Sequence, residues 1–134
     1  VETAMHAFDE PFTATVIHLD YSENNAVLDR SGDGWTVTGI VDWHTAESGH
    51  PEWDLARSIA HYHYRGLDEQ RPFMTAYRSV HTAAPGFEER FPVFMIGERL
   101  SIWEYGQRNK VWFPEGLTLR RWMRQFLDPS LYRV

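Results

Sequence analysis

The chain has 134 residues, of which 43% are hydrophobic and 15% aromatic, so it is long enough for a single domain, residues 1–134, with its own core. Its net charge of −6 disfavours nucleic acid as a partner, because phosphate binding depends on clustered Lys and Arg. No apolar run is long enough to span a membrane, so we expect no membrane partner. The absence of cysteine excludes disulfides and thiolate sites and fits a cytoplasmic protein.

The first half of the chain is typical of β-strands. Three segments are rich in β-branched or other apolar residues: 12–17, 25–29 and 35–43. Between the last two, Asp33-Gly34 is a strong hairpin turn signal. We therefore expect residues 24–42 to form a β-hairpin, with a polar turn at its entry and Asp42 at its exit.

The second half is typical of helices. Four segments show helical spacing of apolar residues between Gly or Pro signals: 51–67, 68–86, 91–110 and 116–127. Thr118 is a candidate N-cap for the last of them. The expected fold class is α+β and mainly α-helical, with a small hairpin-bearing sheet followed by a helical bundle.

Polar residues gather at the two ends of the expected hairpin. The entry carries the spacing H-x-D-x-x-x-x-N, formed by His18, Asp20 and Asn25. The exit reads Ile40-Val41-Asp42-Trp43, and Glu52-Trp53-Asp54-Leu55-Ala56 follows at a helix start. A turn containing His, Asp and Asn is by itself ordinary solvated surface. The presence of Asp42 and then Asp54 after this turn favours a functional site over solvated surface.

These three segments resemble the catalytic loop and the metal-binding segment of the aminoglycoside phosphotransferase and choline kinase group, which are small-molecule kinases of the protein-kinase-like fold. The resemblance covers about residues 12–57. It implies the C-terminal lobe of a phosphotransferase that uses Mg²⁺ and ATP or GTP. The acceptor would be a hydroxyl of a small molecule, either aminoglycoside-like or another amine-bearing compound.

The resemblance also implies roles for individual residues. Asp20 would be the catalytic base, with His18 as a structural member of the same loop, and Asn25 and Asp42 would be the magnesium ligands. Oxygen ligands of this kind suit Mg²⁺, which keeps several waters. Asn24 is an alternative to Asn25, although the spacing favours Asn25. Asp54 would accept backbone N–H groups of the loop and hold its shape.

The sequence of the expected helices does not indicate which acceptor is used. Three acidic residues could meet a cationic acceptor, with solvated surface as the alternative: Glu47, Glu52 and Glu104. Three tryptophans could line an acceptor pocket, with core packing as the alternative: Trp103, Trp112 and Trp122.

A kinase of this fold also needs a lobe that covers the nucleotide phosphates with a glycine-rich loop and a strand lysine. The residues before His18 contain neither glycine nor lysine, and the sole lysine of the chain is Lys110. We therefore expect the N-terminal nucleotide-binding lobe to lie outside this chain, and we expect the chain alone to be inactive.

Two other functions fit parts of the pattern. A degenerate, non-catalytic kinase lobe could serve as a binding module, because a fold does not fix a function. A non-haem Fe(II) site could use His18, Asp20 and a distal histidine, His81, with Arg90 binding an oxoacid. The helical setting of His81 and the low β-content argue against iron.

Overall fold

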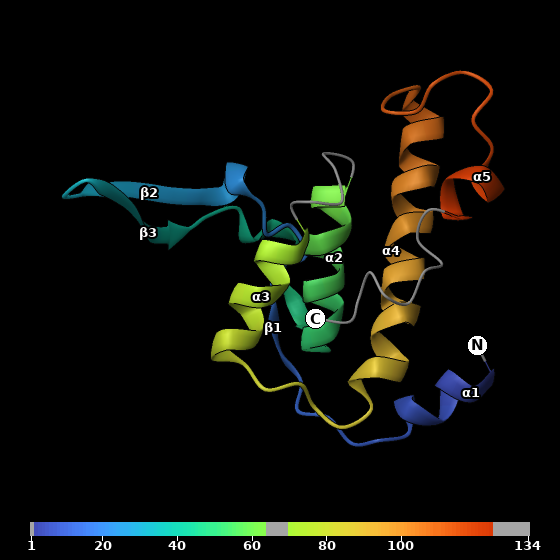
Figure 1. The fold of residues 1–134 in the computed structure, drawn as a ribbon, viewed down its shortest axis with the longest axis horizontal. Helices are drawn as coiled ribbons and strands as arrows, with labels where there is room; N and C mark the ends of the chain where they lie inside the picture. Colours follow the sequence, from blue (N-terminus) through green and yellow to red (C-terminus); the bar gives the residue numbers. More distant parts are fainter. Residues whose placement is uncertain (1, 64–69, 125–134) are drawn as a thin grey trace.

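A computed structural model describes residues 2–63 and 70–124 of the chain, and the fold of these residues is mixed α+β (Figure 1). The strands pair as two antiparallel sheets of two strands each within the described residues: β1 (Thr15–Ile17) with β4 (Glu47–Gly49), and β2 (Ala26–Ser31) with β3 (Gly34–Ile40). The α-helices are α1 (Glu2–Met5), α2 (Pro51–His63), α3 (Gln70–Val80), α4 (Phe87–Asn109) and α5 (Leu119–Met123). Single turns of 3₁₀ helix are formed by η1 (His6–Phe8), η2 (Glu23–Asn25) and η3 (Trp43–Thr45).

The hairpin predicted from the sequence is formed by β2 and β3, and it projects away from the helices (Figure 1). Its tip lies one residue earlier than expected, because Ser31 pairs with Gly34 and leaves Gly32 and Asp33 as the two-residue loop. Gly32 has φ +59°, a conformation that two-residue hairpin loops require and that glycine adopts without strain. The glycine that makes the turn is therefore Gly32 rather than Gly34.

The pairing of β1 with β4 was not predicted from the sequence. It runs from Thr15 opposite Gly49 to Ile17 opposite Glu47. A side chain at position 49 would meet Ile17 Cδ1 at 2.5 Å, so only glycine allows this close approach. Ile17 at the end of β1 lies opposite Glu47, so the residues that follow β1 lie beside η3, where the Thr45 hydroxyl donates to the His18 carbonyl at 2.9 Å.

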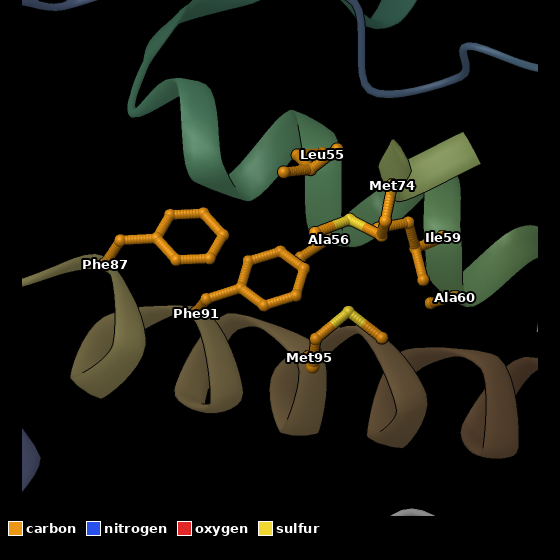
Figure 2. Close-up of a cluster of buried hydrophobic side chains, with 8 residues drawn as sticks. All are labelled: Leu55, Ala56, Ile59, Ala60, Met74, Phe87, Phe91 and Met95. Carbon is orange, nitrogen blue, oxygen red and sulfur yellow. The ribbon is translucent and has the colours of Figure 1, made fainter. Parts of the chain in front are cut away.

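The hydrophobic core lies between α2 and α4, with a contribution from α3 (Figure 2). Its buried members are Leu55, Ala56, Ile59, Ala60, Met74, Phe87, Phe91 and Met95. On α4 the buried residues Phe87, Phe91 and Met95 recur every four positions, which places them on one face. Each buried side chain of this size contributes about 1.5–3 kcal/mol to folding.

Helix α4 begins at Phe87, four residues before the predicted start at 91. Pro92, a residue favoured in the first turn of a helix, here lies inside it. Proline removes one intrahelical hydrogen bond at a cost of about 3 kcal/mol. Burial of Phe87 and Phe91 against α2 offsets this cost.

The remaining expectations for the helices have different outcomes. Helix α1 was not predicted. Thr118 is confirmed as the N-cap of α5, because its side chain accepts the Arg121 N–H at 3.3 Å. The predicted helical residues 64–69 and 125–127 lie outside the described part of the chain. Within that described part, no helix is long and apolar enough to cross a membrane.

The three tryptophans considered for an acceptor pocket separate into two groups. Trp103 packs at 4.8 Å from Phe113 and 5.6 Å from Trp122, measured between ring centroids, so these two tryptophans belong to an aromatic cluster between α4 and α5. Trp112 is instead about half exposed and stacks on Tyr105. Only Trp112 of the three therefore stays a candidate for ligand contact.

Candidate active site

The loop between β1 and β2, residues 18–25, is held at its start by the carboxylate of Asp54 in the first turn of α2. Asp54 Oδ2 accepts the His18 N–H at 3.0 Å, and Oδ1 accepts the Leu19 N–H at 2.8 Å. Leu19 has φ +60°, which is strained for a branched side chain. The two hydrogen bonds to Asp54 and a third from Arg57 Nε to the Leu19 carbonyl, at 3.0 Å, stabilise this backbone conformation.

His18 is 3% exposed and joins the loop to the exit of β3. Its Nδ1 accepts the Asp20 N–H at 3.2 Å, and its Nε2 lies 2.9 Å from the Val41 carbonyl. Because a carbonyl only accepts, Nε2 carries the proton and the ring is the neutral Nε2–H tautomer. The ring also packs edge-on against Trp43, at 4.5 Å between centroids. Both ring nitrogens are thus engaged, which gives His18 a structural position.

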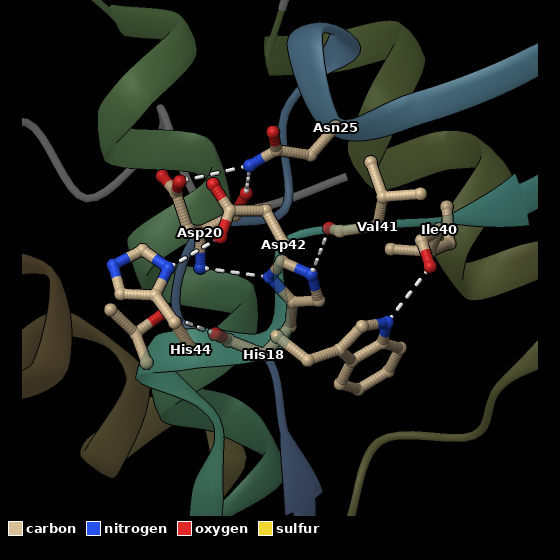
Figure 3. Close-up of polar contacts among 9 residues, drawn as sticks. His18, Asp20, Asn25, Ile40, Val41, Asp42 and His44 are labelled. Carbon is tan, nitrogen blue, oxygen red and sulfur yellow. Dashed lines mark hydrogen bonds and ion pairs between the residues drawn. The ribbon is translucent and has the colours of Figure 1, made fainter.

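Asp20 and Asn25 are in direct contact (Figure 3). The Asn25 amide Nδ2 donates to Asp20 Oδ2 and to the Asp20 carbonyl, both at 2.8 Å. The amide group therefore fixes the orientation of the Asp20 carboxylate and directs Asn25 Oδ1 away from it. Asn24, the alternative residue, is exposed, and the structure gives it no contact with Asp20 among the described hydrogen bonds.

Asp42 follows β3 in a left-handed conformation, with φ 65° and ψ 56°. The backbone N–H of the preceding Val41 donates to the Asn25 carbonyl at 2.9 Å, which ties the hairpin exit to the loop. The Asp42 carboxylate points toward the side chains of Asp20 and Asn25 (Figure 3). Its Oδ1 is 2.5 Å from Nδ1 of His44. Aspartate tolerates positive φ better than most residues, and such strain is concentrated at functional sites.

The donor atoms of this cluster fit Mg²⁺. Asn25 Oδ1 and Asp42 Oδ2 make no hydrogen bond within the described residues, and carboxylate and amide oxygens are the ligands that Mg²⁺ prefers. The described residues contain no cluster of three His, Asp or Glu side chains that could hold a metal. A site of one carboxylate and one amide oxygen, completed by water and phosphate, suits Mg²⁺ and does not suit a metal that needs a full protein cage.

The family model described as phosphotransferase enzyme family matches residues 3–89, which include the loop, the hairpin and α2. The chain belongs to the phosphotransferase enzyme family. The resemblance to the aminoglycoside phosphotransferase and choline kinase group is thereby confirmed. No curated protein and no solved structure matches the chain. Family membership makes this a kinase-like phosphotransferase in general terms, without naming an acceptor.

Two residues that support the candidate site were missed by sequence reasoning. Arg57 NH1 binds Glu98 Oε2 at 2.8 Å while its Nε holds the Leu19 carbonyl, so Arg57 links α4 to the loop. Glu98 is buried and also accepts from Trp53 Nε1 at 2.6 Å. The available signal was the position of Arg57 three residues after Asp54, which places both on one helix face.

The three acidic residues expected to meet an acceptor have different surroundings. Glu52 is 4% exposed and both of its carboxylate oxygens bind Arg90, which argues against an acceptor-binding role. Glu47 is exposed on β4. Glu104 is exposed on α4 and lines a cavity together with Asp20. Only Glu104 of the three therefore borders the cavity beside the candidate base.

The iron alternative is not supported by the structure. Both nitrogens of His18 are used by the Asp20 N–H and the Val41 carbonyl. Arg90, which would have held an oxoacid, is buried and bound to Glu52. As noted above, the described residues hold no three-residue metal cluster. His18, the first expected iron ligand, and Arg90, the residue expected to bind the oxoacid, are thus both engaged in other contacts.

His50 is the residue that precedes α2, and its surroundings predict a pH effect on stability. The ring lies between Phe12 and Phe94, at 4.4 and 5.2 Å between centroids, and Nδ1 accepts the Glu52 N–H at 3.2 Å. Burial lowers the pKa of His50 below its usual range, with Glu52 opposing and Arg90 adding to the shift. The unfolded chain therefore binds a proton at a higher pH than the folded chain does.

We expect the free energy of unfolding to decrease as the pH falls below about 6.5, the ordinary pKa of histidine, and to level off below the pKa of the folded state. The variant His50→Asn, which keeps an acceptor for the Glu52 N–H, should lose this part of the pH dependence. Urea unfolding between pH 5 and pH 8 measures it, with His6→Asn at an exposed histidine as the control. An unchanged pH dependence in His50→Asn would contradict the assignment.

Proposed function

We propose that this chain supplies the catalytic base and the metal ligands of a phosphotransferase that moves a phosphoryl group from ATP or GTP to a hydroxyl of a small molecule. The observation that carries the proposal is the convergence of Asp20, Asn25 and Asp42 at one end of the hairpin. In phosphoryl transfer the protein acts mainly by positioning groups and by neutralising charge, and this cluster offers both.

In the proposed reaction, the Asp20 carboxylate accepts the proton of the acceptor hydroxyl as the oxygen attacks the terminal phosphorus. Asn25 keeps that carboxylate oriented through its two hydrogen bonds. Asn25 Oδ1 and Asp42 would hold Mg²⁺, which when bound neutralises charge on the phosphates. His18 and Asp54 fix the loop backbone and take no part in proton transfer.

We also propose that an N-terminal lobe covers the nucleotide. This part of the proposal is supported by apolar side chains on the hairpin whose exposed fractions are large: 44% for Val27, 52% for Leu28, 70% for Trp35 and 53% for Val37. Leu28 lies directly opposite Val37 in the strand register, so these two exposed apolar side chains share one face of the hairpin, and exposed apolar patches mark interaction sites. The hairpin would contact the missing lobe while its base presents the catalytic cluster.

Replacing Asp42 by Asn tests the metal site. We expect Mg²⁺-dependent phosphoryl transfer to fall by about a hundredfold or more, because the neutral amide no longer balances the charge of the metal, a contribution of several kcal/mol. The measurement is ADP release by the intact protein as a function of Mg²⁺ concentration. Asp29→Asn, at an exposed aspartate on β2, is the matched control. Unchanged metal dependence in the Asp42 variant would contradict its role.

A non-catalytic binding module is the second candidate. The observation in its favour is the contact of His44 with Asp42, which occupies one of the carboxylate oxygens that a metal would use. Binding of nucleotide with Mg²⁺ by the intact protein, without transfer to any of a broad panel of alcohols, would favour this candidate. Transfer to any one of them would rule it out.

A further inference from the structure

The cavity beside the proposed base has a composition that bears on the acceptor. It measures about 370 Å³, and its described lining is Asp20, Arg57, His61, Ser101, Ile102, Glu104, Tyr105, Arg108 and Trp112. A cavity of about 550 Å³ between β1, α2 and α3 is larger, but its described lining does not include Asp20. The smaller cavity is within the range of small-ligand sites, and because Asp20 lines it, an acceptor hydroxyl bound there would lie beside the base.

Most of the charges in the described lining of this cavity are held in ion pairs. Glu104 pairs with Arg108 at 3.3 Å, one turn away on α4. Arg57 pairs with the buried Glu98 at 2.8 Å. Asp20 is the carboxylate of the described lining that stays available for a ligand. The charges therefore do not distinguish a neutral acceptor from a cationic one, and the apolar part of the lining decides the inference.

Two aromatic rings form the apolar part of the lining. Tyr105 and Trp112 stack at 5.0 Å between centroids with their planes 24° apart, and 46% and 49% of their surfaces are exposed. About half of each residue is thus open to a ligand. Such exposed stacked rings offer a flat surface on which a planar ligand group can lie.

The backbone holds Trp112 in a fixed position. Trp112 has φ +70°, a costly conformation for a bulky residue. On either side of it, the Val111 N–H binds the Gly106 carbonyl at 3.0 Å and the Phe113 N–H binds the Val111 carbonyl at 2.9 Å. A Cβ at position 106 would lie 2.5 Å from the Phe113 ring, so the glycine is needed for this turn. The strained residue is therefore built into the turn, as residues at binding sites often are.

We infer that the acceptor is an alcohol that carries a planar ring, with the ring on Tyr105 and Trp112 and the hydroxyl at Asp20. This inference rests on the proposed function, because it takes Asp20 as the base. It narrows the substrate class by a planar ring, which the sequence did not predict.

Three glucosides that share one sugar provide the probes. They are 4-nitrophenyl β-glucoside, which has a planar ring, methyl β-glucoside, which has none, and methyl 2-amino-2-deoxy-β-glucoside, which has an amine instead. The full chain is titrated with each, and the Trp112 indole N–H signal is followed by nuclear magnetic resonance. We expect the ring-bearing glucoside to bind about three- to tenfold more tightly than the other two, the usual range for an aromatic contact.

Two variants test whether the tighter binding of the ring-bearing glucoside depends on Trp112. Trp112→Leu should reduce the affinity for the nitrophenyl glucoside to that for methyl glucoside, as measured by calorimetry. Trp35→Leu, at a tryptophan on the hairpin that is 70% exposed, should leave it unchanged. Added salt should not weaken the binding of the uncharged probe.

Tighter binding of the amino glucoside, lost in Glu104→Gln and weakened by salt, would overturn the inference while leaving Asp20 as the base. The same holds if none of the three probes shifts the Trp112 signal at millimolar concentration. Conversely, ring-dependent binding without phosphoryl transfer in the intact protein would count against the proposed function alone. The two failures are therefore distinguishable.

Discussion

Replacement of Asp20 by Asn is expected to lower turnover by about two to four orders of magnitude, the usual contribution of a positioned general base. Asparagine retains a side-chain oxygen that can accept from Asn25 Nδ2, so the hydrogen bond that orients residue 20 is kept. What is lost is the ability to take the proton of the acceptor hydroxyl. The expected loss is therefore in turnover, with little change in the affinity for nucleotide. Steady-state kinetics of the intact protein measure both.

Two controls accompany this measurement. Asp29→Asn makes the same chemical change at an exposed aspartate of β2 and should leave turnover unchanged. Thermal unfolding of Asp20→Asn should match that of the unmodified chain, because Asp20 is only partly buried. If the Asp20 variant turns over at the normal rate, another group removes the proton and the assignment of the base is wrong.

Much of the candidate site was predictable because its signals are local. His18, Asp20 and Asn25 lie within eight residues, and the strand pattern on either side indicates a turn. The spacing within such a turn determines which side chains meet, and Asn25 does contact Asp20. Asp42 was placed nearby because a hairpin returns its second strand to the start of the first.

What the sequence could not show depends on contacts between distant segments. The pairing of β1 with β4 involves three-residue strands that are too short to produce a periodic pattern. The link from Glu98 to Arg57 and on to the Leu19 carbonyl joins three elements, and no spacing rule relates them. The same is true of Glu52, which was expected either at an acceptor or on solvated surface and is instead buried against Arg90.

These distant contacts explain why the loop can hold a strained residue. Leu19 keeps its positive φ because Asp54 and Arg57 bind its backbone from the same helix. That helix is in turn fixed to α4 by Glu98, which accepts from both Trp53 and Arg57. The geometry of the catalytic loop therefore depends on the packing of α2 against α4. A change that loosens this packing should reduce activity without touching the loop.

The largest effect on stability is expected from Arg90→Met. The Arg90 guanidinium is 3% exposed and binds Glu52 with Nε at 3.0 Å and NH2 at 2.5 Å, while NH1 donates to the carbonyls of Ala7 and Pro85. These hydrogen bonds to Glu52 raise the pKa of Arg90. The substitution leaves the Glu52 carboxylate buried without its cation, which costs about 3–5 kcal/mol. We expect the melting temperature to fall on the order of 10 °C.

A matched pair of variants separates the buried charge from the other losses. Arg108→Met makes the same change at an exposed ion pair on the same helix and should alter stability by less than about 0.5 kcal/mol. The double variant Glu52→Leu/Arg90→Met removes the unpaired carboxylate as well, while the carbonyls of Ala7 and Pro85 still lack their donor. It should therefore recover part of the loss, because a buried pair replaced by apolar residues is tolerated better than one broken on one side. If the double variant is no more stable than Arg90→Met, the cost arises from the carbonyls and from packing around position 90, and the buried charge of Glu52 is not its cause.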